Sequence, residues 1–220
     1  WGAAVNVTIR LPSGGGIGAG PFHSQNPEAW FLHVPGLKLV APATPEDAKG
    51  LLMAAIEEPN PVLFFEHKAL YRSVRGPVPE APYTIEFGKG VIRRPGRDLT
   101  IVTYGMGVHW ALEAAERLTA EGVEIEVVDL RSLLPWDKAL VLESLSRTSR
   151  ILILHEATLT GGVGAEIAAT IAREGFQLLD APVYRVASLD TPVPFSKQLE
   201  WEVFLPKERL LPAIRELLAF

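Results

Sequence analysis

The first third of the chain mixes short apolar runs with polar residues and is interrupted by glycine. Val5, Val7 and Ile9 alternate with polar residues, and this period of two predicts a half-buried strand. Residues 13–21 are too rich in glycine for regular structure and predict a loop. After the loop, the pattern predicts a helix, a strand, a second helix and a second strand, over residues 27–34, 37–41, 45–58 and 62–65.

Beyond residue 84, apolar runs and amphipathic stretches alternate regularly. Four strands and three helices are predicted there, over residues 99–104, 108–120, 123–130, 136–145, 151–155, 164–173 and 183–187. Such alternation favours parallel strands joined by right-handed crossovers, with helices on both faces of an open sheet. The chain ends in a further predicted helix over residues 206–220, which Pro212 is expected to divide into two pieces.

A proline-rich segment separates the two stretches. Residues 72–84 contain three prolines interleaved with charged residues. Proline cannot donate to a strand ladder and holds the chain extended, so this segment is the best linker in the sequence. We therefore predict an α/β protein with two domains, residues 1–83 and residues 84–220.

The amino-acid composition excludes several classes of function. The 220 residues are 48% hydrophobic and 21% charged, as in a globular protein with a sizeable core. The net charge of −5 argues against a nucleic acid or an anionic membrane as partner, because either favours a basic surface. The absence of cysteine rules out disulfides, thiolate metal sites and a catalytic cysteine. No apolar run reaches the ~20 residues that span a bilayer, and no signal segment opens the chain, so we expect a cytoplasmic protein.

The glycine-rich segment contains a weak dinucleotide motif. Gly14, Gly16 and Ala19 fit a relaxed G-x-G-x-x-A pattern. That motif binds a pyrophosphate only when a helix begins directly after it, because the helix amides then point at the phosphates. Here Pro21 and Phe22 intervene. A dinucleotide-binding oxidoreductase therefore remains an alternative function rather than the main hypothesis.

Among the five histidines, His23 is best placed for chemistry. It lies in the loop, in the run Phe22-His23-Ser24-Gln25-Asn26. A loop imidazole flanked by hydroxyl and amide groups suits proton transfer near neutral pH. The other four histidines are expected to be structural, and none has metal-ligand spacing backed by a third ligand: His33, His67, His109 and His155. Glu156 beside His155 is a candidate acid–base pair, although adjacent strand residues point to opposite faces.

The segment GAGPFHSQNPEAWFLHVPGLKLVAPATPEDAKGLL, residues 18–52, resembles a known family. It is similar to the β subunit of the thiamine-diphosphate-dependent decarboxylating component of 2-oxo acid dehydrogenase complexes, of the pyruvate and branched-chain type. The resemblance continues through nearly the whole chain, in AIEEPNPVLFFEHKALYRSV, VVDLRSLLPWD, SRILILHEA, GAEIAATIA and DAPVYRVASLDTPVPF. Many dispersed motifs in the same order are more specific than any one of them.

The resemblance implies a fold and also a missing part. Residues 1–83 resemble the later half of a thiamine-type pyrimidine-binding domain, and residues 84–220 resemble a transketolase C-terminal domain with a mainly parallel sheet. The family's earlier half-domain, with the glutamate that contacts the aminopyrimidine ring, has no counterpart here. The chain opens on Trp1 rather than methionine, which also suggests a fragment, a processed product or an internal start. We can therefore assign no cofactor-binding residue, and we expect this chain alone to be inactive.

The resemblance also implies cofactors and partners. Thiamine diphosphate would be shared with an α subunit, which holds Mg²⁺ on its side, in an α2β2 heterotetramer with a second β subunit. A lipoyl-bearing acyltransferase would accept the acyl group. His23 matches the family's active-site histidine in its His-Ser-Gln context. Its implied role is to orient or protonate the reaction intermediate and to assist acyl transfer.

A potassium ion and a docking surface follow from the same resemblance. The potassium ligands would be main-chain oxygens of Val5, Val7, Thr8, Ala55, Glu58 and Asn60. Carbonyls at a helix C-terminus suit such a cation because they lack helical partners.

Acidic candidates for docking the acyltransferase are Asp190, Glu200, Glu202 and the Phe220 carboxylate. Equally, these acids are explained as a solvated surface.

Two further functions stay open at this stage. The β subunit of acetoin dehydrogenase shares the thiamine chemistry, although the segment NPEAWFLHVPGLK looks more like the 2-oxo acid branch. A non-catalytic module that pairs subunits and docks the acyltransferase is the other.

Overall fold

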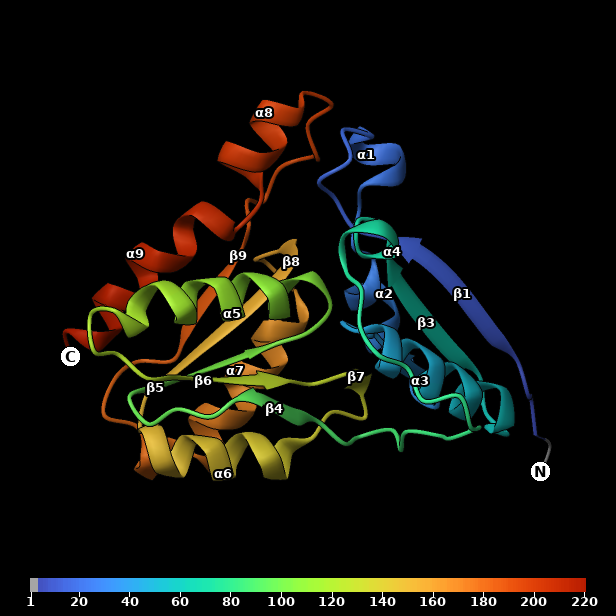
Figure 1. The fold of residues 1–220 in the computed structure, drawn as a ribbon, viewed down its shortest axis with the longest axis horizontal. Coiled ribbons are helices and arrows are strands. Elements are labelled where there is room, and N and C mark those ends of the chain that lie inside the picture. The colour runs from blue at the N-terminus through green and yellow to red at the C-terminus, as the bar shows by residue number, and fades with distance from the viewer. Residues whose placement is uncertain (1–3) are drawn as a thin grey trace.

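Two β-sheets form the frame of the protein, and helices pack on both (Figure 1). The computed structural model describes residues 4–220, so Trp1 and the two residues after it lie outside the described part. The first sheet has the strand order β1-β3-β2-β7, and the second has the order β4-β6-β5-β8-β9. No helix within residues 4–220 combines the length and the apolar character needed to cross a bilayer.

The first sheet is mainly parallel. Its strands are β1 (Thr8–Ser13), β2 (Lys38–Val40), β3 (Val62–His67) and β7 (Ser132–Leu134), and the helices in this part of the chain are α1 (Gly20–His23), α2 (Glu28–Leu32), α3 (Pro45–Glu57) and α4 (Leu70–Ser73). Strands β1 and β2 both run parallel to β3, while β7 runs antiparallel to β2. Because β7 comes from beyond residue 84, the first sheet draws on both predicted domains, and the boundary at residue 83 stays a prediction.

The start of α3 follows the capping chemistry of its sequence. The Thr44 side chain accepts a hydrogen bond from the Asp47 backbone N–H at 3.2 Å, which satisfies a helical donor that has no partner within the helix. Leu51 and Ala55 are buried on the face of α3 that packs against Phe64 of β3. The predicted helix over residues 45–58 is therefore confirmed.

The prediction for the first strand is wrong in its position and its burial. The strand begins at Thr8, and Val5, Val7 and Ile9 are 53%, 45% and 45% exposed rather than half-buried. The reason is that β1 is the edge strand of its sheet and pairs only with β3. Alternation along an edge strand does not by itself say that a second layer covers the apolar side.

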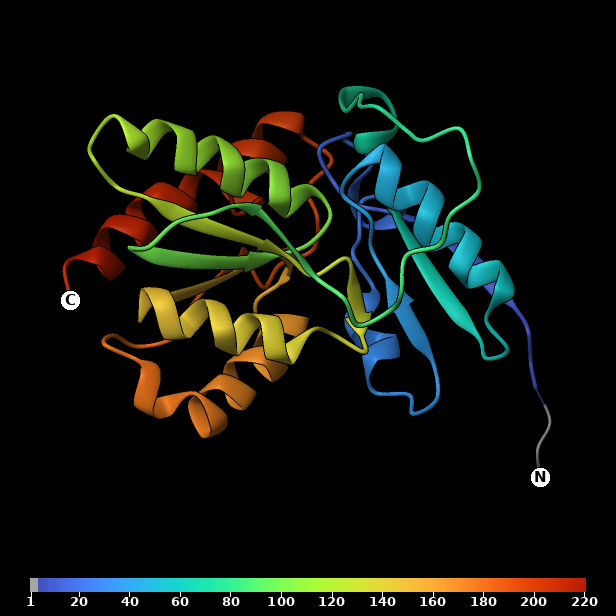
Figure 2. The ribbon, with the colours of Figure 1, turned by 60° about the horizontal axis from the view of Figure 1, so that its bottom comes forward.

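The second sheet contains the four predicted parallel strands. They are β5 (Leu99–Thr103), β6 (Ile125–Asp129), β8 (Ile151–Thr158) and β9 (Tyr184–Ser188), and β4 (Val91–Arg94) adds an antiparallel edge beside β6. Helices α5 (Met106–Thr119) and α9 (Lys207–Leu218) cover one face, whereas α6 (Lys138–Thr148) and α7 (Val163–Glu174) cover the other (Figure 2). Short helical turns follow α7 and precede α9, at Phe176–Leu178, α8 (Lys197–Leu199) and a π-helical turn Glu200–Phe204.

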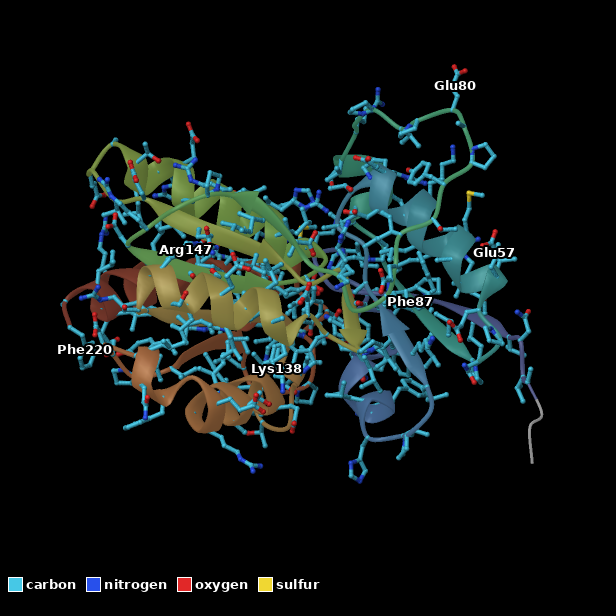
Figure 3. The ribbon with its side chains drawn as sticks, turned by 90° about the horizontal axis from the view of Figure 1, so that it is seen from below. Glu57, Glu80, Phe87, Lys138, Arg147 and Phe220 are labelled. Atoms are coloured by element: carbon cyan, nitrogen blue, oxygen red, sulfur yellow. The ribbon has the colours of Figure 1, made fainter. Side chains whose placement is uncertain are left out.

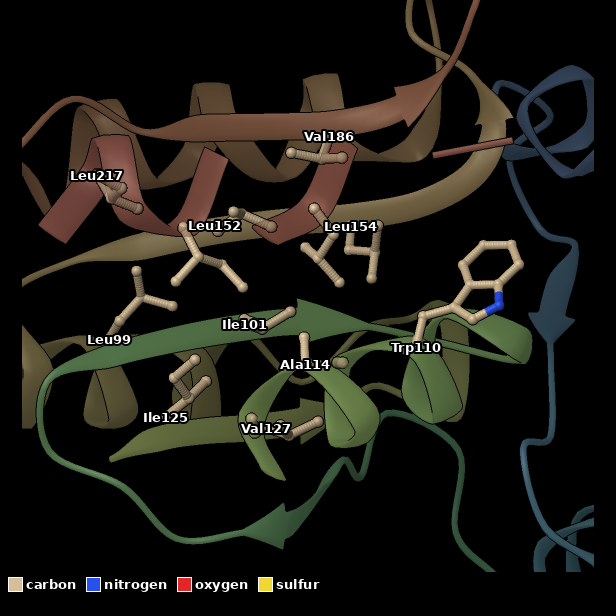
Figure 4. Packing of buried hydrophobic residues seen from close by; sticks show 14 of the residues in the cluster. Leu99, Ile101, Trp110, Ala114, Ile125, Val127, Leu152, Leu154, Val186 and Leu217 are labelled. Carbon is tan, nitrogen blue, oxygen red and sulfur yellow. The ribbon is translucent and has the colours of Figure 1, made fainter. Parts of the chain in front are cut away.

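The hydrophobic core of the second sheet is continuous with that of the first. On one face, Leu99, Ile101 and Leu152 of the strands pack against Trp110 of α5 and Leu217 of α9 (Figure 4). On the other face, a single cluster joins residues of both sheets, including Leu39, Leu63, Phe65, Val102, Leu130 and Val163. The two sheets are therefore held together by shared apolar burial, which fixes the position of one relative to the other.

The predicted break at Pro212 is wrong. Helix α9 runs from Lys207 to Leu218 with Pro212 inside it. Proline removes one backbone hydrogen bond and crowds the preceding turn. Leu210, Ile214 and Leu217 on the same helix are almost fully buried, so core packing holds the helix together across the proline.

The linker between α4 and β4 crosses the surface and is pinned by a lysine. Lys49 of α3 donates from Nζ to the carbonyls of Glu80 and Ala81, each at 3.0 Å. Glu80 projects away from the protein, whereas Phe87 lies back against α3 and the first sheet (Figure 3). We call residues 4–83 the first unit and residues 84–220 the second unit, after the two predicted domains. The linker predicted over residues 72–84 thus has an extended path but a defined one.

A buried histidine fixes the junction between β8 and α7. His155 is fully buried, and its Nδ1 lies 3.1 Å from the Ala157 carbonyl oxygen. A Cβ at Gly162 would come within 2.5 Å of the imidazole, so the turn needs glycine for close packing. This explains the glycine-rich turn at residues 161–164 structurally. Burial lowers the pKa of His155 to about 4, although the Ala157 hydrogen bond opposes this shift.

We predict that His155 makes stability depend on pH. The folded protein binds this proton less readily than the unfolded chain, so the contribution is fully present above the unfolded pKa of about 6.5 and is lost as the pH falls through about 4. In His155→Gln, the free energy of unfolding should fall less between pH 6.5 and 4, by up to about 3 kcal/mol. Urea unfolding across this pH range, with the exposed His33→Gln as control, measures the difference; parallel curves for the wild type and His155→Gln would contradict it.

Candidate active site

Two buried carboxylates of the second unit bind the backbone of the glycine-rich loop. The Gly15 N–H donates to Glu156 Oε1 at 2.5 Å, and the Gly18 N–H donates to Glu200 Oε2 at 2.8 Å. Glu156 lies in β8, and Glu200 begins the π-helical turn before α9. Hydrogen bonds to a charged acceptor are stronger than neutral ones, so these contacts fix the loop against the second unit.

Glu156 also contacts two other segments of the first unit. Asn26 donates from Nδ2 to Glu156 Oε1 at 2.8 Å, and Glu156 Oε2 lies 2.6 Å from Nε2 of His67, the last residue of β3. Burial alone would raise the pKa of Glu156, but the His67 ring and the hydrogen bonds from Gly15 and Asn26 outweigh it and lower that pKa. We call the four residues Gly15, Asn26, His67 and Glu156 the carboxylate clamp.

The region after the loop is tied to the second unit as well. The Tyr104 hydroxyl donates to Glu28 Oε1 at 2.6 Å, and both side chains are buried. Burial raises the pKa of Glu28, although the Tyr104 hydrogen bond opposes this shift. Because Glu28 begins α2, the whole segment between Gly15 and Glu28 is anchored at both ends.

The geometry of the loop argues against a dinucleotide site. The amides of Gly15 and Gly18 already bind carboxylates. Gly14 has a φ of +89°, and a Cβ there would lie 2.2 Å from the His67 ring. Phe195 and Trp201 pack against the rest of the loop, and Figure 1 shows α1 beside the segment that leads into α8. The protein's own side chains therefore occupy the space and the donors that a pyrophosphate would use.

His23 is exposed at the centre of the anchored segment. It is the last residue of α1, a helix of four residues where the sequence predicted a loop, so that prediction is corrected. Ser24 is buried, and its Oγ accepts from the Ala19 N–H at 3.3 Å. Gln25 donates from Nε2 to the Pro21 carbonyl at 2.6 Å. The neighbours of His23 thus hold the backbone turn and leave its imidazole at the surface.

The imidazole lies on a hollow of about 540 Å³, which we call the His23 hollow. Its lining comes from the end of β1, from α1 and the residues around it, and from the turn after β3: Pro12, Pro21, Phe22, His23, Gln25, Pro27, Trp30 and Lys68. Most of these residues are apolar or neutral, and His23 and Lys68 are the ionisable ones. The hollow therefore combines a proton-transfer group, a cation and an apolar rim.

The candidate pair of His155 and Glu156 is separated by the structure. His155 packs on the α7 side, whereas Glu156 faces the glycine loop. The partner of Glu156 is His67, which lies 89 residues away along the chain. From the sequence alone, Glu156 is only a candidate partner of His155 and His67 is expected to be structural, because no local pattern records a contact at a separation of 89 residues.

The segments expected to hold potassium lie side by side. Asn6 donates from Nδ2 to the carbonyls of Ile56 and Glu58, at 3.1 and 2.6 Å, and the Thr8 hydroxyl donates to the Ala55 carbonyl at 2.8 Å. These bonds satisfy the C-terminal carbonyls of α3 in part, since each oxygen has two lone pairs. Within residues 4–220, no group of three or more acidic or histidine side chains is arranged to hold a metal ion. A cation here would rely on main-chain oxygens.

One of the predicted docking acids is not on the surface. Glu200 is fully buried and binds the Gly18 amide, so its assignment to a docking face is wrong. Asp190 is exposed and accepts from the Thr160 backbone N–H and hydroxyl, at 2.9 and 2.6 Å. Glu202 and Phe220 are also exposed. Three of the four candidates therefore remain available to a partner.

We predict that the carboxylate clamp contributes strongly to stability. Glu156→Ala leaves the Gly15 amide, Asn26 and His67 without their acceptor, and removing one partner of a buried pair costs about 3–5 kcal/mol. Glu156→Gln keeps the shape and should cost less, about 1–3 kcal/mol. Denaturant unfolding measures both values, with the exposed Glu143→Gln as a control expected within about 0.5 kcal/mol of the wild type. A Glu156→Ala protein as stable as the wild type would rule out this role.

Comparisons with known proteins agree with the observed architecture. Residues 1–74 match the transketolase pyrimidine binding domain, and residues 88–210 match the transketolase C-terminal domain. The solved structure "Split gene transketolase, inactive beta4 tetramer" superposes with a TM-score of 0.78 at 28% identity, covering 98% of this chain and 67% of that one. The predicted α/β fold, a thiamine-type pyrimidine-binding domain followed by a transketolase C-terminal-like domain, is confirmed.

Curated relatives include β subunits of 2-oxo acid dehydrogenases and of an acetoin oxidoreductase. The 2-oxoisovalerate dehydrogenase subunit beta of Bacillus subtilis is 44% identical over 97% of this chain and 66% of its own length. The acetoin:2,6-dichlorophenolindophenol oxidoreductase subunit beta of the same bacterium is 45% identical over 98% of this chain and 63% of its own length. This chain thus spans slightly less than two thirds of these relatives, and the resemblance to 2-oxo acid dehydrogenase β subunits is confirmed. The match to the C-terminal domain covers residues 88–210, more than half of the chain, so the chain belongs to the family of proteins with a transketolase C-terminal domain.

Proposed function

We propose that this chain acts as the β subunit of a 2-oxo acid dehydrogenase. The reaction is the oxidative decarboxylation of pyruvate or a branched-chain 2-oxo acid, with transfer of the acyl group to a lipoyl group. The observation that carries the proposal is the His23 imidazole, exposed on its hollow while the backbone on both sides of it is anchored to the second unit. The relationship to the B. subtilis 2-oxoisovalerate dehydrogenase β subunit supports the substrate class. A cytoplasmic location is part of this proposal.

Thiamine diphosphate is the cofactor that family membership implies, and when bound it supplies carbanion stabilisation. Among residues 4–220, no carboxyl group lines the His23 hollow, and the resemblance assigns the contact to the aminopyrimidine ring to the earlier half-domain, which has no counterpart here. We propose that an α subunit, with Mg²⁺ on its side, holds the diphosphate end of the cofactor in an α2β2 assembly. The chain alone would be inactive, in keeping with the related split-gene transketolase, whose β4 tetramer is described as inactive.

His23 is proposed to move a proton during acyl transfer. An imidazole can hold or release a proton near neutral pH. The electron pair left on the acyl carbon by the loss of carbon dioxide forms the bond to one sulfur of the lipoyl dithiolane. The S–S bond then breaks, and the second sulfur takes a proton, which His23 donates. The carboxylate clamp anchors the backbone on both sides of His23 and so positions this residue at the hollow for the step.

Acetoin cleavage is the second candidate function. It is favoured by the 45% identity to the β subunit of the B. subtilis acetoin oxidoreductase. Both functions use the same cofactor chemistry, so the fold does not separate them.

The exposed acids remain candidates for docking a basic acyltransferase domain: Asp190, Glu202 and the Phe220 carboxylate. If the chain is a non-catalytic assembly module, docking and subunit pairing would be its whole function.

We also propose that potassium binds between the start of β1 and the end of α3. The main-chain oxygens of Val5, Val7, Thr8, Ala55, Glu58 and Asn60 would hold it. The proximity of Asn6 and Thr8 to the carbonyls that end α3 supports the site. A cation would tie the edge strand to the helix.

Replacing His23 tests the proposed function. In the enzyme assembled from full-length β subunit, α subunit and thiamine diphosphate, we expect turnover of a 2-oxo acid, and we expect His23→Ala to slow reductive acylation of lipoamide by about 100-fold or more. The free energy of unfolding should not change, because the side chain is exposed.

The exposed His33→Ala is the matched control, with activity expected at the wild-type level. If the assembled enzyme turns over acetoin but no 2-oxo acid, acetoin cleavage replaces 2-oxo acid oxidation as the proposed function. If His23→Ala acylates lipoamide at the wild-type rate, His23 has no catalytic role, and the chain would serve only to pair subunits and dock the acyltransferase.

Potassium binding is tested by thermal unfolding. At equal ionic strength, replacing sodium by potassium should raise stability by about 1–3 kcal/mol once potassium exceeds its Kd by ~10- to 100-fold, with a matching rise in Tm. Equal melting curves in the two salts would show that the carbonyls of this region do not select potassium.

A further inference from the structure

Lys68 lies in the lining of the His23 hollow, and in the described part of the chain no carboxylate forms a direct ion pair with its ammonium. It follows β3 directly, and its backbone N–H donates to the Ser13 carbonyl at 2.9 Å, which fixes it beside the glycine loop. The lining of the hollow contains no aspartate or glutamate. By contrast, Lys38, Lys138 and Lys207 pair with glutamates at 2.5, 2.8 and 2.8 Å. Within residues 4–220, the Lys68 ammonium has no such ion pair.

Partial burial removes some of the hydration of the Lys68 ammonium. Its side chain is half-buried, and burial lowers the pKa of Lys68, although the charge of Glu156 opposes the shift. Glu156 is itself held by the carboxylate clamp and does not contact the ammonium. A cation that has lost part of its hydration is stabilised by an anion that enters the same space.

The rest of the hollow indicates which anion fits. Phe22 and Trp30 are large exposed aromatic residues, and three prolines add to the apolar rim. Such a surface suits a short hydrocarbon chain, while the ammonium suits one carboxylate at its end. Phosphorylated ligands would favour several donors and backbone amides, and the nearby glycine amides are already occupied.

We propose that Lys68 binds the carboxylate of the 2-oxo acid substrate, with the acyl chain directed along the apolar rim toward His23. This inference rests on the proposed function and adds a specificity determinant to it. A neutral hydroxyketone gains nothing from the ammonium, so Lys68 would favour the acid over acetoin. Because the carboxylate leaves as carbon dioxide, Lys68 stabilises the bound ground state and not the later acyl transfer.

The kinetic consequence is specific. Removing an interaction made with the ground state raises KM without lowering kcat. In the assembled enzyme, Lys68→Gln should raise the KM for the 2-oxo acid about tenfold or more, with kcat unchanged or higher. Lys68→Arg should restore most of the affinity. The exposed Lys89→Gln removes the same charge outside the hollow and should leave KM unchanged.

Two unreactive inhibitors show whether Lys68→Gln acts through the lost charge or through a change in the shape of the hollow. Isobutyrate and isobutyramide have similar size, and only the first is an anion. We expect Lys68→Gln to weaken inhibition by isobutyrate about tenfold and to leave inhibition by isobutyramide unchanged.

Three results would overturn the inference. If Lys68→Gln has an unchanged KM, Lys68 does not bind the substrate carboxylate. If the variant weakens inhibition by isobutyrate and isobutyramide equally, the substitution has changed the shape of the hollow. A lower kcat with an unchanged KM would show that the role of Lys68 is structural. Each of these is measured with a wild-type enzyme that turns over the 2-oxo acid, so the proposed function survives them. A wild-type assembly without that turnover contradicts the proposed function itself.

Discussion

The contact between Glu156 and the Gly15 amide is the interaction on which the rest of the site depends. Between Gly15 and Glu28 the chain forms one helix of four residues and no strand, so few backbone hydrogen bonds of its own hold this segment in place. Carboxylates from the second unit supply the missing acceptors. The unit that carries His23 and the unit that fixes its position are therefore different, and each is incomplete without the other.

Burying these charges has a cost that the geometry offsets. A buried carboxylate is strongly destabilising unless donors surround it, and Glu156 receives two hydrogen bonds and faces an imidazole. A second polar junction lies between α3 and the second sheet, where Arg93 binds both Asp47 and Asp129. Burial raises the pKa of Asp129 to about 6, although Arg93 opposes this. Ionic contacts and the shared apolar cluster together define one arrangement of the two sheets.

Much of the fold could be predicted, because local rules decide it. The cap at Thr44 and the four buried parallel strands follow from residue pattern alone. Strand β4 was not predicted because its residues are half-buried at an edge and include two arginines. Strand β7 has three residues and pairs with the other sheet, after Arg131 in a left-handed conformation. These features depend on tertiary contacts that no local pattern encodes.

The site divides in the same way. His23 could be singled out because its neighbours and its resemblance to the family's histidine are local in sequence. The pairing of Glu156 with His67 could not, since it joins residues 89 positions apart. Glu200 was assigned to the surface because acidic residues are mostly exposed, yet it is buried where the Gly18 amide needs an acceptor. Glu156 and Glu200 can be identified as acceptors for the loop amides only once the fold brings these distant segments together.

Amide hydrogen exchange at single-residue resolution tests this account most directly. If buried carboxylates hold the loop, the Gly15 and Gly18 amides should exchange as slowly as those in the core of β3, although they lie in no helix or strand. Fast exchange at both glycines, with β3 still protected, would contradict the account.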